Sequence, residues 1–306
     1  MPSRRRFLQQ SSAIAALAAL SPLIPNFAFA APQLLSRTIP SSGEALPVIG
    51  LGTSQTFNVD AASEQMAPLE QVLKAFLEGG GKVIDTAPSY GDAEAVSGEL
   101  VKRAGGRGKV FLATKVSSTG RDAGLRQIEA SFAALQTDKI DLIQVHNLQD
   151  TATQLKLLRE LKEQGRIRYI GITHYVESAH DDLLAVLAKE KVDFVQVNYS
   201  IGARNAEKRL LPYCADKGIA TLINRTYEAG RLFAKVKGKA LPAWAQSELD
   251  ATSWAQLMLK FVLANPAVTT VIPATSQPKY MLDNLLAGQG RLPNAQQLQR
   301  IAAEFA

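Results

Sequence analysis

The sequence predicts a (β/α)8 barrel, and three observations lead to that fold class. Short apolar, β-branched runs alternate with amphipathic stretches along almost the whole chain. The runs are apolar on both faces, which is typical of parallel strands joined by crossover helices. There are eight such units in about 250 residues, the usual size of this barrel. A Rossmann sheet would need Gly-x-Gly-x-x-Gly after its first strand, whereas residues 50–55 read Gly-Leu-Gly-Thr-Ser-Gln.

The expected elements follow one another in chain order. A β-hairpin comes first, with strands at residues 36–39 and 46–48 on either side of a Ser-Gly turn. Eight strands are expected at residues 48–52, 82–86, 110–115, 140–146, 167–173, 194–198, 220–224 and 268–273. Helices are expected at residues 69–77, 93–103, 125–135, 153–164, 181–189, 207–217 and 254–264, with a C-terminal helix from 278 to 286. The longest irregular segment, residues 227–253, is expected to be a functional or mobile loop.

The first 30 residues differ in character from the rest. Three arginines without any acidic residue precede a short apolar run, and Ala28-Phe29-Ala30 follows. This is the order of an export signal with its cleavage site, and the apolar run is too short to span a bilayer. The run from Ser3 to Leu8 resembles the twin-arginine motif, although an ordinary Arg-rich secretory signal is the alternative. We expect residues 1–30 to be a signal that directs the folded protein to the periplasm through the twin-arginine export machinery, and residues 31–306 to be a single domain.

Composition excludes several classes of protein. The net charge of +6 falls to +3 without the first 30 residues, which is no nucleic-acid-binding footprint. A single cysteine, Cys214, excludes an internal disulfide and a Cys-based metal cluster, and three histidines leave little room for a metal enzyme. No further stretch is long and apolar enough for a membrane helix. We therefore expect no bound metal, no nucleic acid, no stable membrane insertion and a monomer.

Polar or ionisable residues recur at the ends of six consecutive predicted strands. They are 24 to 31 residues apart, and they are Asp85, Lys115, His146, His174, Asn198 and Arg225. Because the carboxyl ends of barrel strands meet at one rim, these side chains are expected close together. Each alone would be explained as a solvated loop residue or a satisfied structural group. A lysine beside an aspartate on a neighbouring strand, however, carries a desolvation cost that structure alone seldom requires.

Tyr90 completes this group. It lies five residues after Asp85 in a turn sequence that would bring its ring over the same rim, and the alternative is an aromatic residue packed against a helix. Tyrosine is a poor acid near neutrality, because the pKa of its hydroxyl is ordinarily ~10, but a nearby ammonium favours the phenolate. Asp85 would keep Lys115 charged and oriented, so the three residues form a coherent proton donor. His146 can then donate a hydrogen bond to the substrate oxygen.

The motifs around these residues resemble the aldo-keto reductase family. Asp85-Thr86-Ala87 with Tyr90-Gly91, Thr114-Lys115 and Val145-His146 are similar to the Asp–Tyr–Lys–His tetrad of that family. Further similar segments are residues 50–53, 165–172, 196–199, 272–273 and 283–284. The resemblance covers residues 34–306. It implies reversible reduction of a small-molecule carbonyl substrate by a nicotinamide cofactor, with Tyr90 as the proton donor.

The resemblance also implies which residues hold the cofactor: Gly52, Thr53 and Asp85 at the nicotinamide ribose, Thr173, His174 and Gln196 at the carboxamide, Arg225 against the ring, and Thr275, Ser276, Asp283 and Asn284 at the adenosine end. Six positions depart from the family pattern. Thr173-His174 replaces a common Ser-Asn, Arg225 replaces a stacking aromatic residue, and Asn147 replaces a frequent tryptophan. Where NADP-preferring members often carry Arg or Lys, this chain has Gln277 and Tyr280, for which Lys279 or the lysines at 235, 237 and 239 could substitute. We expect NADP(H) to be preferred, with NAD(H) possible.

Two other functions stay open at this point. A cofactor-binding sensor or partner subunit would bind the nicotinamide tightly with little turnover, and retention of all four tetrad residues weighs against it. A barrel aldolase would use Lys115 as a Schiff-base nucleophile, which the spacing of Asp85 and Tyr90 disfavours.

Overall fold

Eight parallel strands form one sheet in which every strand pairs with its neighbours in the sequence, in the order β3 to β10. The computed structural model describes residues 33–306, so the predicted export signal lies outside the described residues. The strands are β3 (Leu51–Gly52), β4 (Val83–Asp85), β5 (Phe111–Val116), β6 (Ile140–His146), β7 (Ile167–Thr173), β8 (Phe194–Asn198), β9 (Ala220–Asn224) and β10 (Thr270–Val271).

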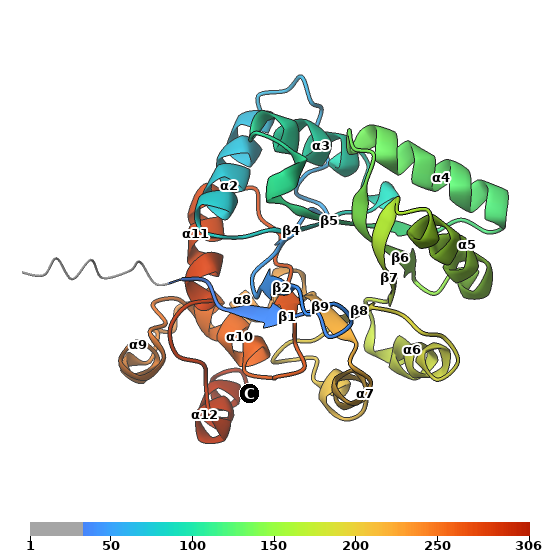
Figure 1. The fold of residues 1–306 in the computed structure, drawn as a ribbon. Helices are drawn as coiled ribbons and strands as arrows, with labels where there is room; N and C mark the ends of the chain where they lie inside the picture. The colour runs from blue at the N-terminus through green and yellow to red at the C-terminus, as the bar shows by residue number, and fades with distance from the viewer. Residues whose placement is uncertain (1–32) are drawn as a thin grey trace, which may run out of the picture. The chain divides into compact units, whose positions relative to one another are not determined.

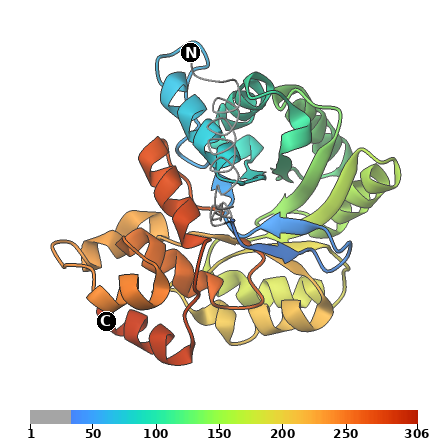
Figure 2. The ribbon, with the colours of Figure 1, turned by 60° about the vertical axis from the view of Figure 1, so that its left-hand side comes forward.

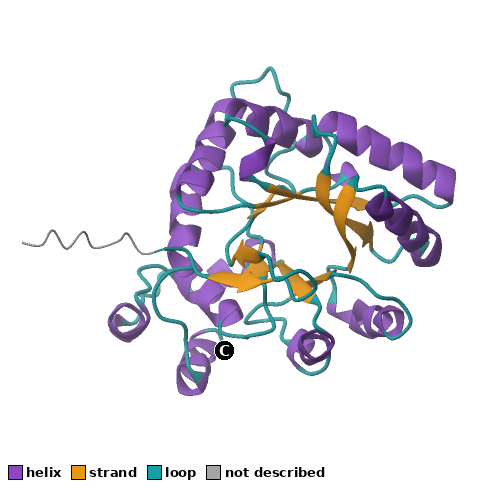
Figure 3. Ribbon diagram, viewed as in Figure 1, coloured by secondary structure: helices purple, strands orange, loops and turns teal. Residues whose placement is uncertain are grey.

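The two edges of this sheet meet and close it into a barrel (Figure 3). Isolated parallel bridges join Ile49 to Val271 and Gly52 to Ala274. Gly52 permits this approach, because a Cβ at that position would lie 2.6 Å from the carbonyl oxygen of Ile272. The predicted (β/α)8 barrel is confirmed.

Helices surround the barrel (Figure 1). They are α2 (Met66–Glu78), α3 (Ala93–Arg103), α4 (Arg121–Ala134), α5 (Thr151–Glu163), α6 (His180–Leu187), α7 (Leu210–Lys217), α10 (Trp254–Leu263), α11 (Pro278–Ala287) and the C-terminal α12 (Ala295–Glu304). Several boundaries differ from the prediction. Helix α4 begins four residues before the predicted 125 and α2 three residues before the predicted 69, and α12 follows the helix predicted at 278–286, beyond which no helix was expected. The first and last barrel strands are shorter than residues 48–52 and 268–273, because the barrel edges there pair through isolated bridges. The helix predicted at 207–217 begins at Leu210, after a 3-10 turn.

The predicted N-terminal hairpin is present and covers one end of the barrel (Figure 2). Its strands, β1 (Ser36–Thr38) and β2 (Ala45–Pro47), are antiparallel. Ile39 and Leu46 of the hairpin are buried in the same apolar cluster as three aromatic residues of the barrel strands, Phe111, Tyr169 and Phe194. The rings of these three pack with centroids 5.6 to 6.0 Å apart. The interior of the barrel is therefore filled by core side chains at this end.

The segment after β9 is more regular than the sequence indicated. Residues 227–253 contain two short helices, α8 (Arg231–Lys235) and α9 (Ala243–Leu249). Lys235 and Lys239 donate hydrogen bonds to the carbonyl oxygens of Phe305 and Glu304, at 2.7 and 3.0 Å. These bonds anchor the segment to the end of α12. Within residues 33–306, no helix has both the length and the apolar character needed to cross a membrane.

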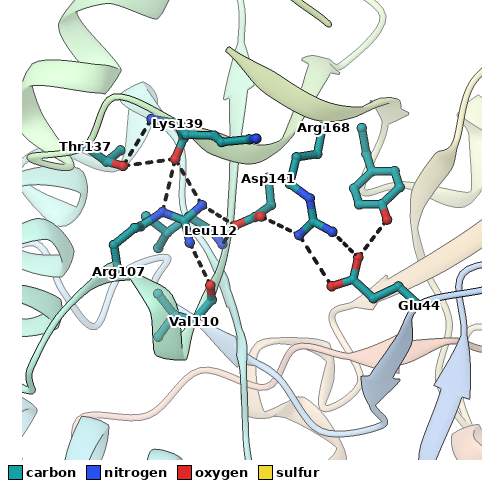
Figure 4. Close-up of polar contacts among 9 residues, drawn as sticks. Glu44, Arg107, Val110, Leu112, Thr137, Lys139, Asp141 and Arg168 are labelled. Carbon is teal, nitrogen blue, oxygen red and sulfur yellow. Dashed lines mark hydrogen bonds and ion pairs between the residues drawn. The ribbon is translucent and has the colours of Figure 1, made fainter. Parts of the chain in front are cut away.

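A cluster of charges joins β5, β6 and β7 near the hairpin (Figure 4). The Asp141 side chain is buried, with only 3% of the residue exposed. Its carboxylate accepts a hydrogen bond from the Leu112 N–H at 2.8 Å and forms ion pairs with Arg107 and Arg168. Arg168 also pairs with Glu44 of the hairpin. Because each partner comes from a different element, the Asp141 carboxylate fixes how these elements meet.

Candidate active site

The carboxyl ends of β4, β5 and β6 bring Asp85, Lys115 and His146 to the same end of the barrel. The Lys115 ammonium donates to Asp85 Oδ2 at 2.8 Å and to the Thr86 carbonyl at 2.7 Å. Burial lowers the pKa of Lys115, but the Asp85 carboxylate and the Tyr90 hydroxyl outweigh it, so the pKa lies above its usual value. The amine is therefore held as a cation. A cation can stabilise the phenolate of a nearby tyrosine, whereas a Schiff-base nucleophile has to be a neutral amine.

Tyr90 lies over this ion pair. It ends the 3-10 turn Pro88–Tyr90 that follows β4, and it is half-buried. The Lys115 Nζ is 5.0 Å from the centroid of its ring. The ring of His146 stands edge-on to it, with centroids 6.2 Å apart and an interplanar angle of 84°. The four side chains that the sequence singled out are thus brought together by the structure.

His146 is neutral at pH 7. Burial, followed by the positive charge of Lys115 and the nearby His174, lowers the pKa of His146 to about 4. A neutral imidazole has one nitrogen that donates and one that accepts a hydrogen bond. His146 can therefore donate to a carbonyl oxygen without adding a charge to the site.

Asp85, Tyr90 and His146 border a cavity of about 600 Å³, whereas Lys115 does not line it, and six of the eleven predicted cofactor residues do. The lining includes Gly52, Thr53, Asp85, Tyr90, His146, Thr173, Gln196 and Arg225. Thr53 is fixed beside Asp85, because its hydroxyl donates to the Asp85 carbonyl at 3.0 Å. Gln196 donates to Asp85 Oδ1 at 2.7 Å and accepts from the Thr173 hydroxyl at 3.2 Å. The floor of the cavity is thus one hydrogen-bonded network.

His174 is not among the lining residues, and its neighbour Tyr175 is. The His174 ring stacks on Tyr175 at 5.5 Å and accepts a hydrogen bond from the Tyr175 N–H through Nδ1. The Arg225 guanidinium lies over the Tyr175 ring at 4.3 Å. Tyr175, 41% exposed, therefore forms the cavity wall with Arg225. Tyr175 was missed from the sequence, where an aromatic ring directly after the strand-end pair Thr173-His174 was the available signal.

The four residues predicted at the adenosine end also lie outside this cavity lining. Thr275 accepts a hydrogen bond from the Gln277 N–H at 3.0 Å, next to Ser276 at the start of α11. Asp283 accepts from Ser253 at 2.7 Å and Gln256 at 2.6 Å, and Asn284 accepts from the Tyr227 hydroxyl at 2.6 Å. In the described residues, Asp283 and Asn284 thus tie α11 to α10 and to the segment after β9.

Two amide side chains near the site were missed from the sequence. Asn224, at the end of β9, lines the cavity and has a buried Oδ1 without a partner among residues 33–306. Gln144, in β6, donates to Asp85 Oδ1 at 3.4 Å. Gln144 interrupts a run of buried apolar residues, and Asn224 is a polar residue at a strand end; these were the available signals.

Comparisons with known proteins show what the chain is similar to. A model described as "Aldo/keto reductase family" matches residues 48–303. The methylglyoxal reductase YeaE of Escherichia coli is 30% identical over 249 residues, which cover 78% of this chain and 85% of that protein. The NADH-specific methylglyoxal reductase of Escherichia coli is 30% identical over 196 residues, 55% of this chain and 59% of that protein. The crystal structure of an aldo/keto reductase from Klebsiella pneumoniae in complex with NADP and acetate has a TM-score of 0.73 and 25% identity, and it covers 86% of this chain and 93% of that one.

Proposed function

The chain belongs to the aldo/keto reductase family, and on that premise we propose that it reduces aldehydes or ketones to alcohols with a reduced nicotinamide cofactor. One observation carries the proposal: the buried Lys115–Asp85 ion pair lies beside Tyr90 at the edge of a cavity. Such a pair costs desolvation, and it supplies the charge that a tyrosine needs in order to act as an acid.

The cavity residues fit a nicotinamide. The Asn224 Oδ1 is a buried acceptor without a partner among the described residues. Gly52 packs closely against the Ile272 carbonyl, so closely that a side chain at position 52 would collide with it. A carboxamide carries two N–H donors and one acceptor, which suits the Thr173 and Gln196 side chains nearby. The other proposed contacts are the ribose residues Gly52, Thr53 and Asp85, the ring neighbour Arg225 and the adenosine residues Thr275, Ser276, Asp283 and Asn284.

The chain's own residues would divide the chemistry as follows. A bound reduced cofactor supplies the hydride. Tyr90 donates its hydroxyl proton to the substrate oxygen, and the Lys115 cation stabilises the phenolate that remains. Asp85 holds the Lys115 ammonium in place at 2.8 Å. His146 donates a hydrogen bond to the same substrate oxygen and so favours the negative charge that develops there.

We favour NADP(H) over NAD(H). The Klebsiella pneumoniae structure contains NADP, which supports this preference, although one Escherichia coli relative is NADH-specific. Two of the loop lysines, Lys235 and Lys239, are engaged by carbonyl oxygens of the C-terminal residues. Lys237, which is exposed, and Lys279 remain as candidates for a 2′-phosphate. We favour Lys279, because it lies two residues after Gln277 at the start of α11, with its Nζ 4.9 Å from the centroid of the Tyr280 ring.

The proposed function is tested by following reduced-nicotinamide absorbance with a reactive aromatic aldehyde and either NADPH or NADH. We expect turnover with both and a lower KM for NADPH. Lys279→Ala should raise the KM for NADPH about tenfold, the value of one charge-assisted hydrogen bond, and leave that for NADH unchanged, whereas Lys237→Ala should alter neither. Binding of both cofactors without oxidation would favour the sensor or partner-subunit function instead.

We also propose that the protein is exported folded to the periplasm by the twin-arginine machinery, on the strength of residues 1–30 alone. Fractionation of cells that express the full chain should recover a protein beginning at Ala31 in the periplasm. Replacing Arg4 and Arg5 with lysine should retain it in the cytoplasm. Export that survives this change would indicate an ordinary secretory signal.

A further inference from the structure

The Asp85 carboxylate is held at both oxygens by buried donors. Lys115 binds Oδ2, whereas Oδ1 accepts a hydrogen bond from Gln196 at 2.7 Å and a longer one from Gln144 at 3.4 Å. All four side chains belong to residues that are at most 3% exposed. Where water is excluded, the protein donors alone set the orientation of a carboxylate.

Gln144 is not explained by packing. It lies between Ile143 and Val145 in β6, it is completely buried, and its Oε1 has no partner among the described residues. Burying an amide with an unpaired oxygen costs stability that an apolar residue of similar size would not cost. A residue that is expensive to bury in this way points to a role in the site above it.

The neighbouring strand makes room for this amide. Gly171 of β7 is the register partner of Gln144. A Cβ at Gly171 would lie 3.0 Å from the Gln144 Cγ and 2.8 Å from the Phe194 carbonyl oxygen. The glycine thus leaves Gln144 the space to extend toward Asp85.

We propose that Gln144 is a positioning residue for the proton donor, an inference that rests on the proposed function. Gln144 does not line the cavity, so it acts through Asp85. Gln144 and Gln196 both donate hydrogen bonds to Asp85 Oδ1. The carboxylate is thereby oriented with Oδ2 toward the Lys115 ammonium, which stays beside the Tyr90 ring. Its N–H dipole also makes the potential around the carboxylate less negative, which favours the Tyr90 phenolate.

Gln144→Met tests this role, because methionine has a similar length but no N–H donor. We expect kcat to fall about tenfold, the fold-change that corresponds to one hydrogen bond to a charged group. The KM values for NADPH and for the aldehyde should stay within about twofold, because the residue touches neither. A second readout needs no turnover. In protein labelled with 13C at tyrosine Cζ, the Tyr90 resonance, assigned by its loss in Tyr90→Phe, should titrate at a higher pH in Gln144→Met than in the wild type.

Two further variants separate positioning from stability. Gln144→Leu, among the same apolar neighbours, should unfold at the same or a higher temperature than the wild type and show the same loss of kcat. Gln154→Met is the matched control, since Gln154 is equally buried and donates to the Ser118 and Gly120 carbonyls instead. It should leave the Tyr90 midpoint unchanged and kcat within about twofold.

The outcomes are distinguishable. A Tyr90 midpoint in Gln144→Met equal to that of the wild type, or a loss of kcat no larger than in Gln154→Met, would overturn the role of Gln144. A wild-type protein that reduces no carbonyl would overturn the proposed function, and the titration would still decide whether Gln144 acts on Tyr90.

Discussion

Tyr90→Phe is expected to lower kcat by about a thousandfold, since loss of a positioned general acid typically costs 10²- to 10⁴-fold. The change removes only the hydroxyl, so the half-buried ring keeps its place over Lys115 and against His146. The Kd for NADPH, measured by fluorescence titration, should therefore stay within about twofold. A loss in kcat with unchanged cofactor affinity would identify Tyr90 as the proton donor.

The matched control is Tyr213→Phe. Tyr213 lies on α7, away from the cavity, and its hydroxyl donates to the Leu187 carbonyl at 3.2 Å. Its loss should alter thermal stability slightly and turnover not at all. If Tyr90→Phe retained more than about a tenth of the wild-type kcat, another group would have to supply the proton.

The barrel was predictable because its strands are buried on both faces and its helices on one. Strands β5 to β9 lie within the predicted ranges to within one residue, since each is a run of mostly buried residues that pairs on both sides. The boundaries of β3 and β10 were less predictable. The contact between these edges depends on Gly52 meeting the Ile272 carbonyl, and no local pattern encodes which two edges close a barrel.

The grouping of the proposed catalytic residues was predictable for a related reason. Parallel strands put their carboxyl ends at one rim, so Asp85, Lys115 and His146 had to meet once the strands were identified. Beyond the strand ends this reasoning stops, because side-chain alternation holds only within a strand. His174 and Tyr175 follow the last residue of β7, and their conformations, rather than the period of the strand, decide that Tyr175 lines the cavity.

Asp141→Ala is expected to lower the free energy of unfolding by about 3 to 5 kcal/mol, the usual cost of removing one partner from a buried ion pair. The change removes the acidic partner of the Arg107 guanidinium and one of the two acidic partners of Arg168, which keeps Glu44. It also leaves the Leu112 N–H without its acceptor. For a chain of this size the melting temperature should fall by roughly 6 to 15 °C. Asp138→Ala, at an exposed position three residues earlier, should change it by less than about 2 °C.

The same variant should separate stability from catalysis. Asp141 lies near the start of β6 and His146 at its end, so one strand carries the charge cluster at the closed end of the barrel and a site residue at the other. In this fold the carboxyl ends of the strands generally serve function and the amino ends serve stability. At 20 °C, where the variant remains folded, its kcat and KM should therefore match the wild type. A fall in kcat at that temperature, with the melting temperature unchanged, would mean that the cluster acts on the site and not on the fold.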